Sequence, residues 1–308
     1  VFASLDTRHV RDSNVVASPV ARGVFVPDRS DEQLVLGRFD HRWSDRQMLT
    51  LRASAQRFRW DQQPGGLTLP GSGTRYQTDV QSLLVTGART LSMRSVNEVR
   101  AQVSRYIDLR TDLSPSVFVS RAGYSIEGGR LGPTGFGADP EVTFEGSDTW
   151  SLITDRHAWR VGAGGTMVRA HNLSLPDARG AYFFAGAPAQ FPQPYLFVQA
   201  FAPTPTAAIA DPRSAAVFAF AQDDVRLRPT LTLNLGVRYD VERVSHVQSV
   251  EVGADRNNVQ PRAGIAWDVG GRGRTVVRGG AGVFTQQQLL HPINRGQLEG
   301  PNGIVTVR

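Results

Sequence analysis

Apolar and polar residues alternate along several stretches of the chain, which is typical of β-strands. Between positions 230 and 241 the odd positions are apolar or aromatic: Leu231, Leu233, Leu235, Val237, Tyr239 and Val241. The even positions are polar or glycine: Thr230, Thr232, Asn234, Gly236, Arg238 and Asp240. A strand places successive side chains on opposite faces, whereas a helix would mix these two sets. The pattern therefore predicts a strand with one apolar and one polar face.

The same alternation occurs nearer the start of the chain. In residues 48–58 one set is Leu49, Leu51, Ala53 and Ala55, and the other is Thr50, Arg52, Ser54 and Gln56. In residues 37–43 the sequence predicts that Phe39 and Trp43 share one face and that Arg38, Asp40 and Arg42 share the other. Three charged side chains on one strand face require water or one another as partners.

The connections between the predicted strands are of two kinds. Five are short and rich in turn-forming residues, and each predicts a hairpin: Ser44 to Gln47, Leu91 to Ser95, Asp155 to His157, Leu227 to Pro229, and Val269 to Arg274. Others are long and rich in Gly, Pro and polar residues: Arg59 to Gln77, Leu109 to Ser147, and His171 to Arg213. Short turns at one end and long loops at the other are typical of outer-membrane barrels. A soluble β-sandwich gives a similar pattern in each strand, so it stays an alternative.

Composition excludes several classes of protein. The 308 residues include no Cys, so disulfides, thiolate metal sites and Cys nucleophiles are absent. The net charge of +6 comes from Arg residues scattered from Arg8 to Arg308, and this even spread does not favour nucleic-acid binding. The longest apolar run, residues 215–221, is too short for a transmembrane helix, whereas a barrel strand needs only about 9 to 11 residues.

Residues 220–284 carry a resemblance to a known family. One part is Phe220, Gln222, Asp223 and Asp224, followed by Arg228-Pro229 and Leu-Thr-Leu-Asn-x-Gly-x-Arg-Tyr at 231–239. The other is Asn258-x-x-Pro261-Arg262-x-Gly264, followed by Thr-Val-Val-Arg-Gly-Gly-x-Gly-x-Phe at 275–284. These motifs resemble the barrel of TonB-dependent outer-membrane receptors, in particular the large Oar-like type. Looser matches at residues 38–54, 91–106 and 149–165 extend the resemblance over most of the chain.

The resemblance implies an all-β, antiparallel transmembrane β-barrel located in the cell outer membrane. It identifies residues 1–308 as an internal part of that barrel, about ten of the family's twenty-two strands, without the signal peptide, the plug domain, the Ton box or the C-terminal strands. It further implies energised import of a large or scarce substrate, with the TonB complex acting through the plug. The expected partners are outer-membrane lipid, the TonB complex and an unidentified extracellular substrate, with no nucleic acid. Adhesion or secretion are open alternatives to import.

Two other functional classes also stay open. One is a passive or structural outer-membrane barrel without a plug. The other is a soluble β-sandwich module, such as a carbohydrate-binding one.

Constellations that could carry chemistry are scarce. The six histidines lie far apart, without the i, i+4 spacing of a zinc site: His9, His41, His157, His171, His246 and His291. Residues 162–166, Gly-Ala-Gly-Gly-Thr, lack the Lys of a phosphate-binding loop and lie within a strand pattern. Asp223 and Asp224 are adjacent, so a strand would point them to opposite faces. We expect no enzymatic activity and no catalytic, cofactor-binding or metal site.

Aromatic residues in the long connections are the only candidates for ligand contact: Trp60, Tyr76, Phe136, Phe144, Tyr182, Phe183, Phe184 and Tyr195. The competing interpretation, which we favour, is that they form the interfacial aromatic girdle of a membrane barrel, so no ligand-binding residue is assigned. The polar set of Arg38, Arg42, Arg52, Arg238 and Asp240 is expected to face a plug or water, with structural Arg–carboxylate pairs.

Overall fold

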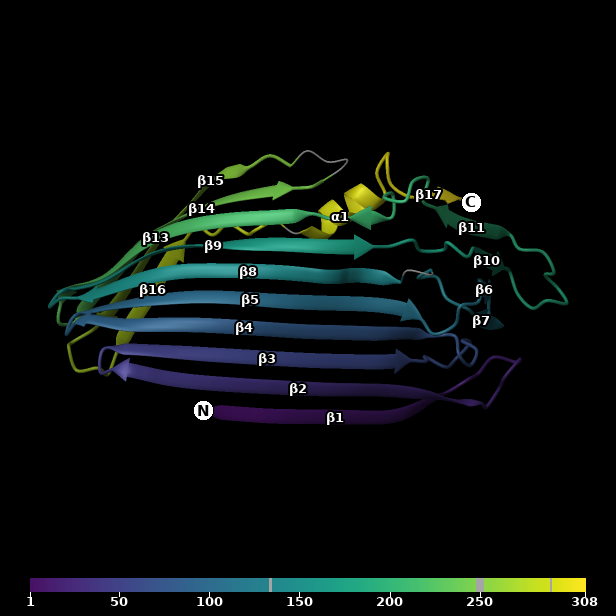
Figure 1. Ribbon diagram of the computed structural model, residues 1–308, viewed down its shortest axis with the longest axis horizontal. Helices are drawn as coiled ribbons and strands as arrows, with labels where there is room; N and C mark the ends of the chain where they lie inside the picture. The colour runs from purple at the N-terminus through teal and green to yellow at the C-terminus, as the bar shows by residue number, and fades with distance from the viewer. Residues whose placement is uncertain (133–134, 248–251, 289) are drawn as a thin grey trace.

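The fold is a single large antiparallel sheet with a smaller sheet at one end (Figure 1). The computed structural model describes residues 1–132, 135–247, 252–288 and 290–308, without the side chains of 136–139 and 291. The large sheet has the strand order β1-β2-β3-β4-β5-β8-β9-β13-β14-β15-β16, and the two-residue β12 (Ile209–Ala210) pairs with the end of β9. Each long strand of this sheet pairs with the long strands that precede and follow it in the sequence, as in the wall of an up-and-down barrel.

The long strands have these bounds: β1 Phe2–Val15, β2 Phe25–Ser44, β3 Gln47–Gln62, β4 Thr74–Ser92, β5 Ser95–Asp112, β8 Phe136–Ile153, β9 His157–Leu173, β13 Arg213–Arg228, β14 Leu231–Ser245, β15 Asp255–Asp268 and β16 Val276–Gly282. The prediction of about ten strands was therefore close, and the missed one is β1. Most of them exceed the roughly 9 to 11 residues needed to cross a bilayer. The wall must therefore extend beyond the membrane.

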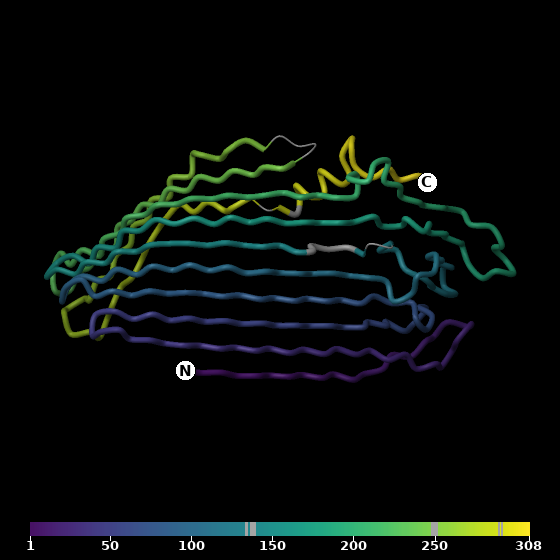
Figure 2. The backbone as a smooth tube through the Cα atoms, viewed as in Figure 1, coloured from purple at the N-terminus to yellow at the C-terminus, as the bar shows by residue number. Residues whose placement is uncertain are grey.

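All five predicted hairpin turns are confirmed, and all lie at the same end of the sheet (Figure 2). The long connections lie at the opposite end. They are shorter than the sequence suggested, because the strands continue into them: β3 ends at Gln62 and β4 begins at Thr74. In the same way β5 ends at Asp112 and β8 begins at Phe136, both inside the predicted Leu109 to Ser147 loop.

The pairing register separates the sheet into a polar face and an apolar face, because directly opposed residues point the same way. Arg238 lies opposite both Phe220 and Gln260, and Val237 lies opposite both Ala221 and Pro261. Across most of the sheet the polar face carries the even positions, and in β8 it carries the odd ones. The predicted faces are confirmed: Arg38 lies opposite Arg52.

The loop end contains a second sheet that the sequence analysis did not predict. It consists of β6 (Phe118–Arg121), β7 (Ser125–Glu127), β10 (Ala181–Phe184), β11 (Leu196–Phe201) and β17 (Val305–Val307), in the order β17-β11-β10-β6-β7. One helix, α1 (Leu290–Leu298), lies nearby (Figure 1). Among the described residues, no helix has the length and apolar character that a membrane crossing requires.

The buried apolar residues gather at the loop end rather than in the middle of the wall. They include Val16, Val26, Ala181, Phe184, Val198 and Ala210. In the wall itself, large apolar side chains such as Val217, Leu235 and Ile265 are exposed. A sheet with this distribution has no internal core, so another medium must cover its apolar face.

Candidate substrate path and loop cap

The apolar face carries a band with the dimensions of a bilayer core. On β3 the band runs over Leu49, Leu51, Ala53 and Ala55, and it is bounded by Gln47 and Arg57. This span is about ten residues, close to what a tilted barrel strand needs to cross the hydrocarbon region. Lipid is therefore the medium that fits this face.

Four of the five tryptophans lie on the apolar face close to the short turns: Trp43, Trp150, Trp159 and Trp267. All four are more than one third exposed. Tryptophan accumulates at membrane–water interfaces, where its ring is apolar and its N–H finds a polar partner. The row therefore marks the interface on the side of the short turns.

The polar face is organised by ion pairs between neighbouring positions of one strand. Arg38 Nε lies 2.9 Å from Asp40 Oδ2 on β2, and Arg238 Nη2 lies 2.7 Å from Asp240 Oδ1 on β14. The guanidinium of Arg238 also stacks 3.9 Å from the ring centroid of Phe218. Of the four arginines predicted on this face, Arg38 and Arg238 therefore pair with a carboxylate, whereas Arg42 and Arg52 have no ion pair among the described residues. Such a face suits contact with water or protein.

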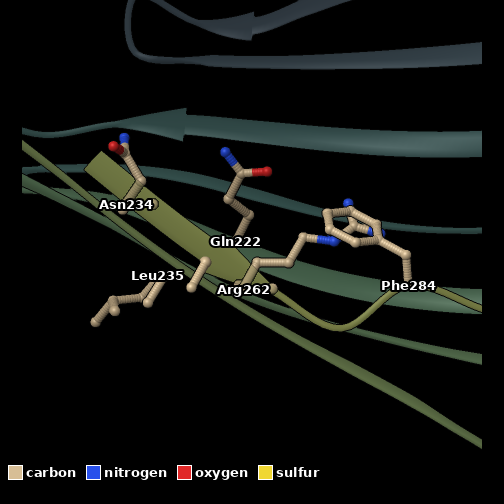
Figure 3. Close-up of a pocket in the computed structure, with 11 residues that line it drawn as sticks. Gln222, Asn234, Leu235, Arg262 and Phe284 are labelled. Carbon is tan, nitrogen blue, oxygen red and sulfur yellow. The ribbon is translucent and has the colours of Figure 1, made fainter. Parts of the chain in front are cut away.

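A pocket of about 370 Å³ opens on the wall near the short turns (Figure 3). Gln222 and Asn234 point to one side of the ribbon and Leu235 to the other, which shows the two faces directly. The guanidinium of Arg262 lies 4.8 Å from the ring of Phe284, which belongs to the segment that follows β16. That segment continues along the polar face, where the backbone N–H of Gln288 donates to Glu242 Oε2 at 2.8 Å.

An aromatic cluster occupies the polar face at the loop end, where the wall opens toward the loops. Trp60 on β3 and Tyr76 on β4 are directly opposed, and their rings stack with centroids 5.2 Å apart. Trp60 donates its indole N–H to Asp28, and the guanidinium of Arg110 lies 5.4 Å from the Tyr76 ring. The cluster combines aromatic faces with fixed charges, and this combination can bind a polar ligand with planar or apolar surfaces.

Four strands of the second sheet, β6, β7, β10 and β11, form a folded cap with their loops, which we define as residues 113–132 and 174–208. Arg130 binds Asp177 through Nε and Nη2 at 2.7 and 2.6 Å. The same guanidinium lies 5.5 Å from the rings of both Phe118 and Phe183. Phe184 is buried under Arg121, 3.7 Å from its guanidinium. The long loops are therefore packed structures.

Asp112, at the end of β5, ties the wall to the cap. Its carboxylate accepts hydrogen bonds from the backbone N–H groups of Leu131 and Gly132, each at 3.2 Å, and lies 3.4 Å from Arg179 Nη1. Burial raises the pKa of Asp112 above its ordinary value, and these bonds oppose the rise. The Asp177 carboxylate beside Arg130 raises the pKa of that guanidinium in turn.

The histidines do not assemble a metal site among the described residues, where no group of three or more His, Cys, Asp or Glu could hold an ion. Three of them each bind one aspartate instead: His9 with Asp31, His157 with Asp223, and His171 with Asp211. His41 stacks on Phe39, and the side chain of His291 lies outside the described residues. Asp223 and Asp224 point to opposite faces, as predicted, because Asp224 accepts from Asn234.

A comparison with known protein families identifies the family of this chain. The family model described as an outer membrane beta barrel domain matches residues 13–253 and 246–306. The chain belongs to this family. No curated protein matches it in sequence. The barrel domain is accordingly an outer-membrane protein, with its apolar face toward lipid.

Solved structures with a similar fold are outer-membrane transporters. The outer membrane transporter YddB from Escherichia coli superposes with a TM-score of 0.63 at 12% identity, over 90% of this chain and 35% of that one. The copper transporter OprC matches with a TM-score of 0.58 at 13% identity, over 91% and 40% of the two chains. The ferric yersiniabactin uptake receptor FyuA from Yersinia pestis matches at 0.53 and 13% identity, over 86% and 39%. The barrel domain thus spans less than half of each relative.

These matches confirm the resemblance to TonB-dependent receptor barrels at the level of the fold, while the Oar-like type stays a prediction. Of the loop aromatics with described side chains for which a girdle was favoured, Phe144 lies on the apolar face, opposite Met167, where a girdle residue would lie. Trp60 and Tyr76 lie on the polar face, and Tyr182, Phe183 and Phe184 lie in the cap. Tyr195 is exposed in the cap loops, and the side chain of Phe136 lies outside the described residues.

The observed girdle is the tryptophan row, which the sequence analysis missed. The sequence could have indicated this row, because each of these four tryptophans lies within five residues of a predicted hairpin turn. The alternation of apolar and polar residues did not reveal the tryptophan row, because alternation shows on which face of a strand a residue lies but not its depth in the membrane.

Proposed function

We propose that the barrel domain is part of the wall of a TonB-dependent outer-membrane transporter that imports a substrate too large or too scarce for porins. The observation that carries this proposal is the combination of a lipid-facing band with a charged opposite face. A wall whose polar face holds paired charges suits a barrel that encloses a protein plug or water. The similarity to several solved transporters supports the same assignment.

The proposal requires more wall than this chain provides. Among the described residues, β1 pairs only with β2, and β16 pairs only with β15, so the sheet has two free edges. Unpaired backbone groups in lipid cost several kcal/mol each, so stable membrane structures close their strand edges. We therefore infer that further strands of the same protein complete the barrel. A plug and its TonB-binding segment are the remaining parts that the proposed transporter needs.

We place the first contact with substrate at the loop end of the polar face. Trp60, Tyr76 and Arg110 form a surface there that includes both π-faces and a cation, and the cap lies beside it. Selectivity would arise from this surface and from the cap loops, because loops carried on a rigid wall commonly supply binding residues. The chemical identity of the substrate is open among siderophores, oligosaccharides, peptides and protein cargo.

The coding sequence on both sides of this chain provides the direct test. A signal peptide and a plug domain upstream, with further alternating strands downstream, would support the proposal. A continuing barrel without a plug would contradict it and favour a passive or structural barrel. Planar-bilayer conductance of the full-length protein provides a second test: a plugged transporter stays closed without TonB, whereas a passive barrel conducts steadily.

A further inference from the structure

The polar face carries an excess of positive charge close to the short turns. Between β9 and β16 this part of the face holds five arginines: Arg160, Arg226, Arg238, Arg262 and Arg278. Three aspartates lie on the same part of the face: Asp224, Asp240 and Asp268. In the described part of the chain, Arg238 is the one of these five arginines that forms an ion pair, with Asp240.

The other two aspartates are bound to uncharged donors. Asp224 accepts a hydrogen bond from the side-chain amide of Asn234 at 2.7 Å. Asp268 accepts one from the backbone N–H of Gly273 at 2.9 Å, within the turn between β15 and β16. The remaining arginines are therefore not neutralised by the acids around them, and this part of the face can accept an anion.

The strand register arranges three of these arginines around a glycine. Arg160 lies opposite Gln222, Gln222 opposite Gly236, and Gly236 opposite Arg262, so these four residues form one row across β9, β13, β14 and β15. Arg238 lies two residues along β14 from Gly236, on the same face. The three arginines line one cavity of about 180 Å³ together with Gln222 and Gly236. Like charges around one cavity repel each other, so an anion between them is favourable.

The pocket of about 370 Å³ in Figure 3 adjoins this cavity, because Gln222, Gly236 and Arg262 line both. Four glycines of neighbouring strands form its floor: Gly236, Gly264, Gly280 and Gly282. The volume lies within the range of small-molecule sites, about 300 to 1,000 Å³. The floor therefore leaves space where side chains would otherwise lie.

An exposed aromatic ring forms one side of this pocket. Phe284 is 70% exposed, although it lies on the polar face. Its ring lies 4.8 Å from the guanidinium of Arg262, and both side chains point to the same side of the sheet as Gln222 (Figure 3). A ring in this position can pack against a planar or apolar group of a ligand while the guanidinium binds its charge.

The site is distinct from the aromatic cluster at the loop end. Arg160 is the fourth residue of β9 after the turn and directly follows Trp159, which lies in the interface on the turn side. Trp60 and Tyr76 lie near the opposite ends of their strands. A ligand that enters from the loop side therefore meets the aromatic cluster first and this site afterwards.

We propose that the two adjoining cavities, which we call the arginine pocket, bind an oxyanion group of the transported substrate, either a phosphate or a carboxylate. Arg160 and Arg262 donate hydrogen bonds to it, because guanidinium groups bind such oxyanions in a two-point geometry, and Arg238 adds positive charge. The ring or chain that carries the oxyanion lies on the glycine floor against Phe284. The inference rests on the proposed function, since a substrate passes this face only if the barrel is a transport path.

The first test measures the binding of four probes to the full-length protein in mild detergent by isothermal titration calorimetry. Phenyl phosphate and benzoate combine a ring with an oxyanion, inorganic phosphate lacks the ring, and phenol lacks the charge. We expect phenyl phosphate or benzoate to bind at least about tenfold more tightly than inorganic phosphate and phenol. The tighter of the two identifies the oxyanion as phosphate or carboxylate. Binding of neither would overturn the proposal.

The second test compares variants. Arg160→Gln with Arg262→Gln should weaken binding of the tighter probe at least about tenfold. Arg42→Gln with Arg52→Gln removes the same charge from exposed arginines elsewhere on the polar face and should leave binding unchanged. Equal binding by the first variant and the wild type, or equal loss in both variants, would overturn the proposal.

A third variant fills the pocket without removing charge. The Cβ of Gly236→Val would lie 3.5 Å from the backbone oxygen of Ala221 and 3.6 Å from Gln222 Cβ, which are ordinary contacts, so the strand should tolerate it. We expect it to weaken binding of the tighter probe, whereas Gly87→Val, with nothing within 4 Å of its Cβ, should not. Unchanged binding by Gly236→Val would overturn the placement of the ligand, even if the arginine variant fails to fold.

These outcomes are separable from those of the proposed function. Binding by a full-length protein that lacks a plug would support the arginine pocket and contradict only the TonB-dependent mechanism. Absence of binding in a plugged receptor would overturn only the arginine pocket.

Discussion

Arg130 binds Asp177 through two parallel hydrogen bonds, Nε to Oδ1 at 2.7 Å and Nη2 to Oδ2 at 2.6 Å. The pair joins two connections that lie 47 residues apart in the sequence. Asp177 is buried and its backbone φ is +55°, a conformation that Asp and Asn tolerate better than other residues. The pair therefore fixes the shape of the cap at a point where the backbone itself is constrained.

We expect Asp177→Asn to loosen the cap by about 1 to 2 kcal/mol, because the variant keeps the backbone conformation but removes the charge from the hydrogen bonds. Hydrogen exchange of residues 118–131 should become faster, while exchange in the wall stays unchanged. Asp155→Asn is the matched control, since Asp155 pairs with Arg94 at an exposed turn. Equal exchange in the Asp177 variant and the wild type would contradict a role for the pair.

The pKa of Asp112 predicts a pH dependence of the cap. Burial raises this pKa above its ordinary value of 3.8, so the folded cap favours the protonated carboxyl. The stability from this group is therefore fully present below the ordinary value and is lost as pH rises through the raised pKa. We expect the protection of the Leu131 and Gly132 amides, measured relative to the intrinsic exchange rate at each pH, to fall in the wild type as pH rises through the raised pKa of Asp112. The variant Asp112→Asn should show a smaller change, and an identical profile would contradict the prediction.

Gly164 lies where the polar face leaves no room for a side chain. A Cβ at this position would lie 2.7 Å from the ring of Phe218 and 2.5 Å from the backbone oxygen of Gly146. We expect Gly164→Ala to destabilise the wall by about 1 to 3 kcal/mol, because the backbone oxygen cannot move aside without disturbing the strand pairing. Gly87→Ala is the control, since nothing lies within 4 Å of its added Cβ. Unfolding by guanidinium in lipid vesicles measures both variants.

The tryptophan row predicts a fluorescence signature. Proteins that keep one tryptophan, with the others replaced by Phe, should divide into two groups in vesicles of brominated lipid. Trp43, Trp150, Trp159 and Trp267 should be quenched most by bromine close to the headgroup, because they lie at the interface. Trp60 should be little quenched, because it lies on the polar face. Strong quenching of Trp60 would contradict the assignment of the faces.

Sequence could predict the wall because its features are local. A hairpin depends on the few residues of its turn, and the alternation in residues 230–241 is visible without any tertiary contact. The strand β1 was missed because its two faces are both polar for much of its length, with Asp6 and Arg8 on one and Thr7 and His9 on the other. A strand without an apolar set gives no period-two signal.

The cap could not be predicted in this way, because it depends on distant segments. The parallel pairing of β6 with β10 joins residues more than 60 positions apart, and strands of three to six residues carry little periodicity.

The two ends of the wall differ in how freely they can change in evolution. The hairpins at one end leave almost no room for inserted residues, because the residues that flank a turn, such as Ser44 and Gln47, are themselves paired. At the other end the strands project past the bilayer before the connections begin, so an insertion there does not alter strand pairing in the membrane. Insertions and substitutions can therefore accumulate at the loop end while the turn end keeps its sequence.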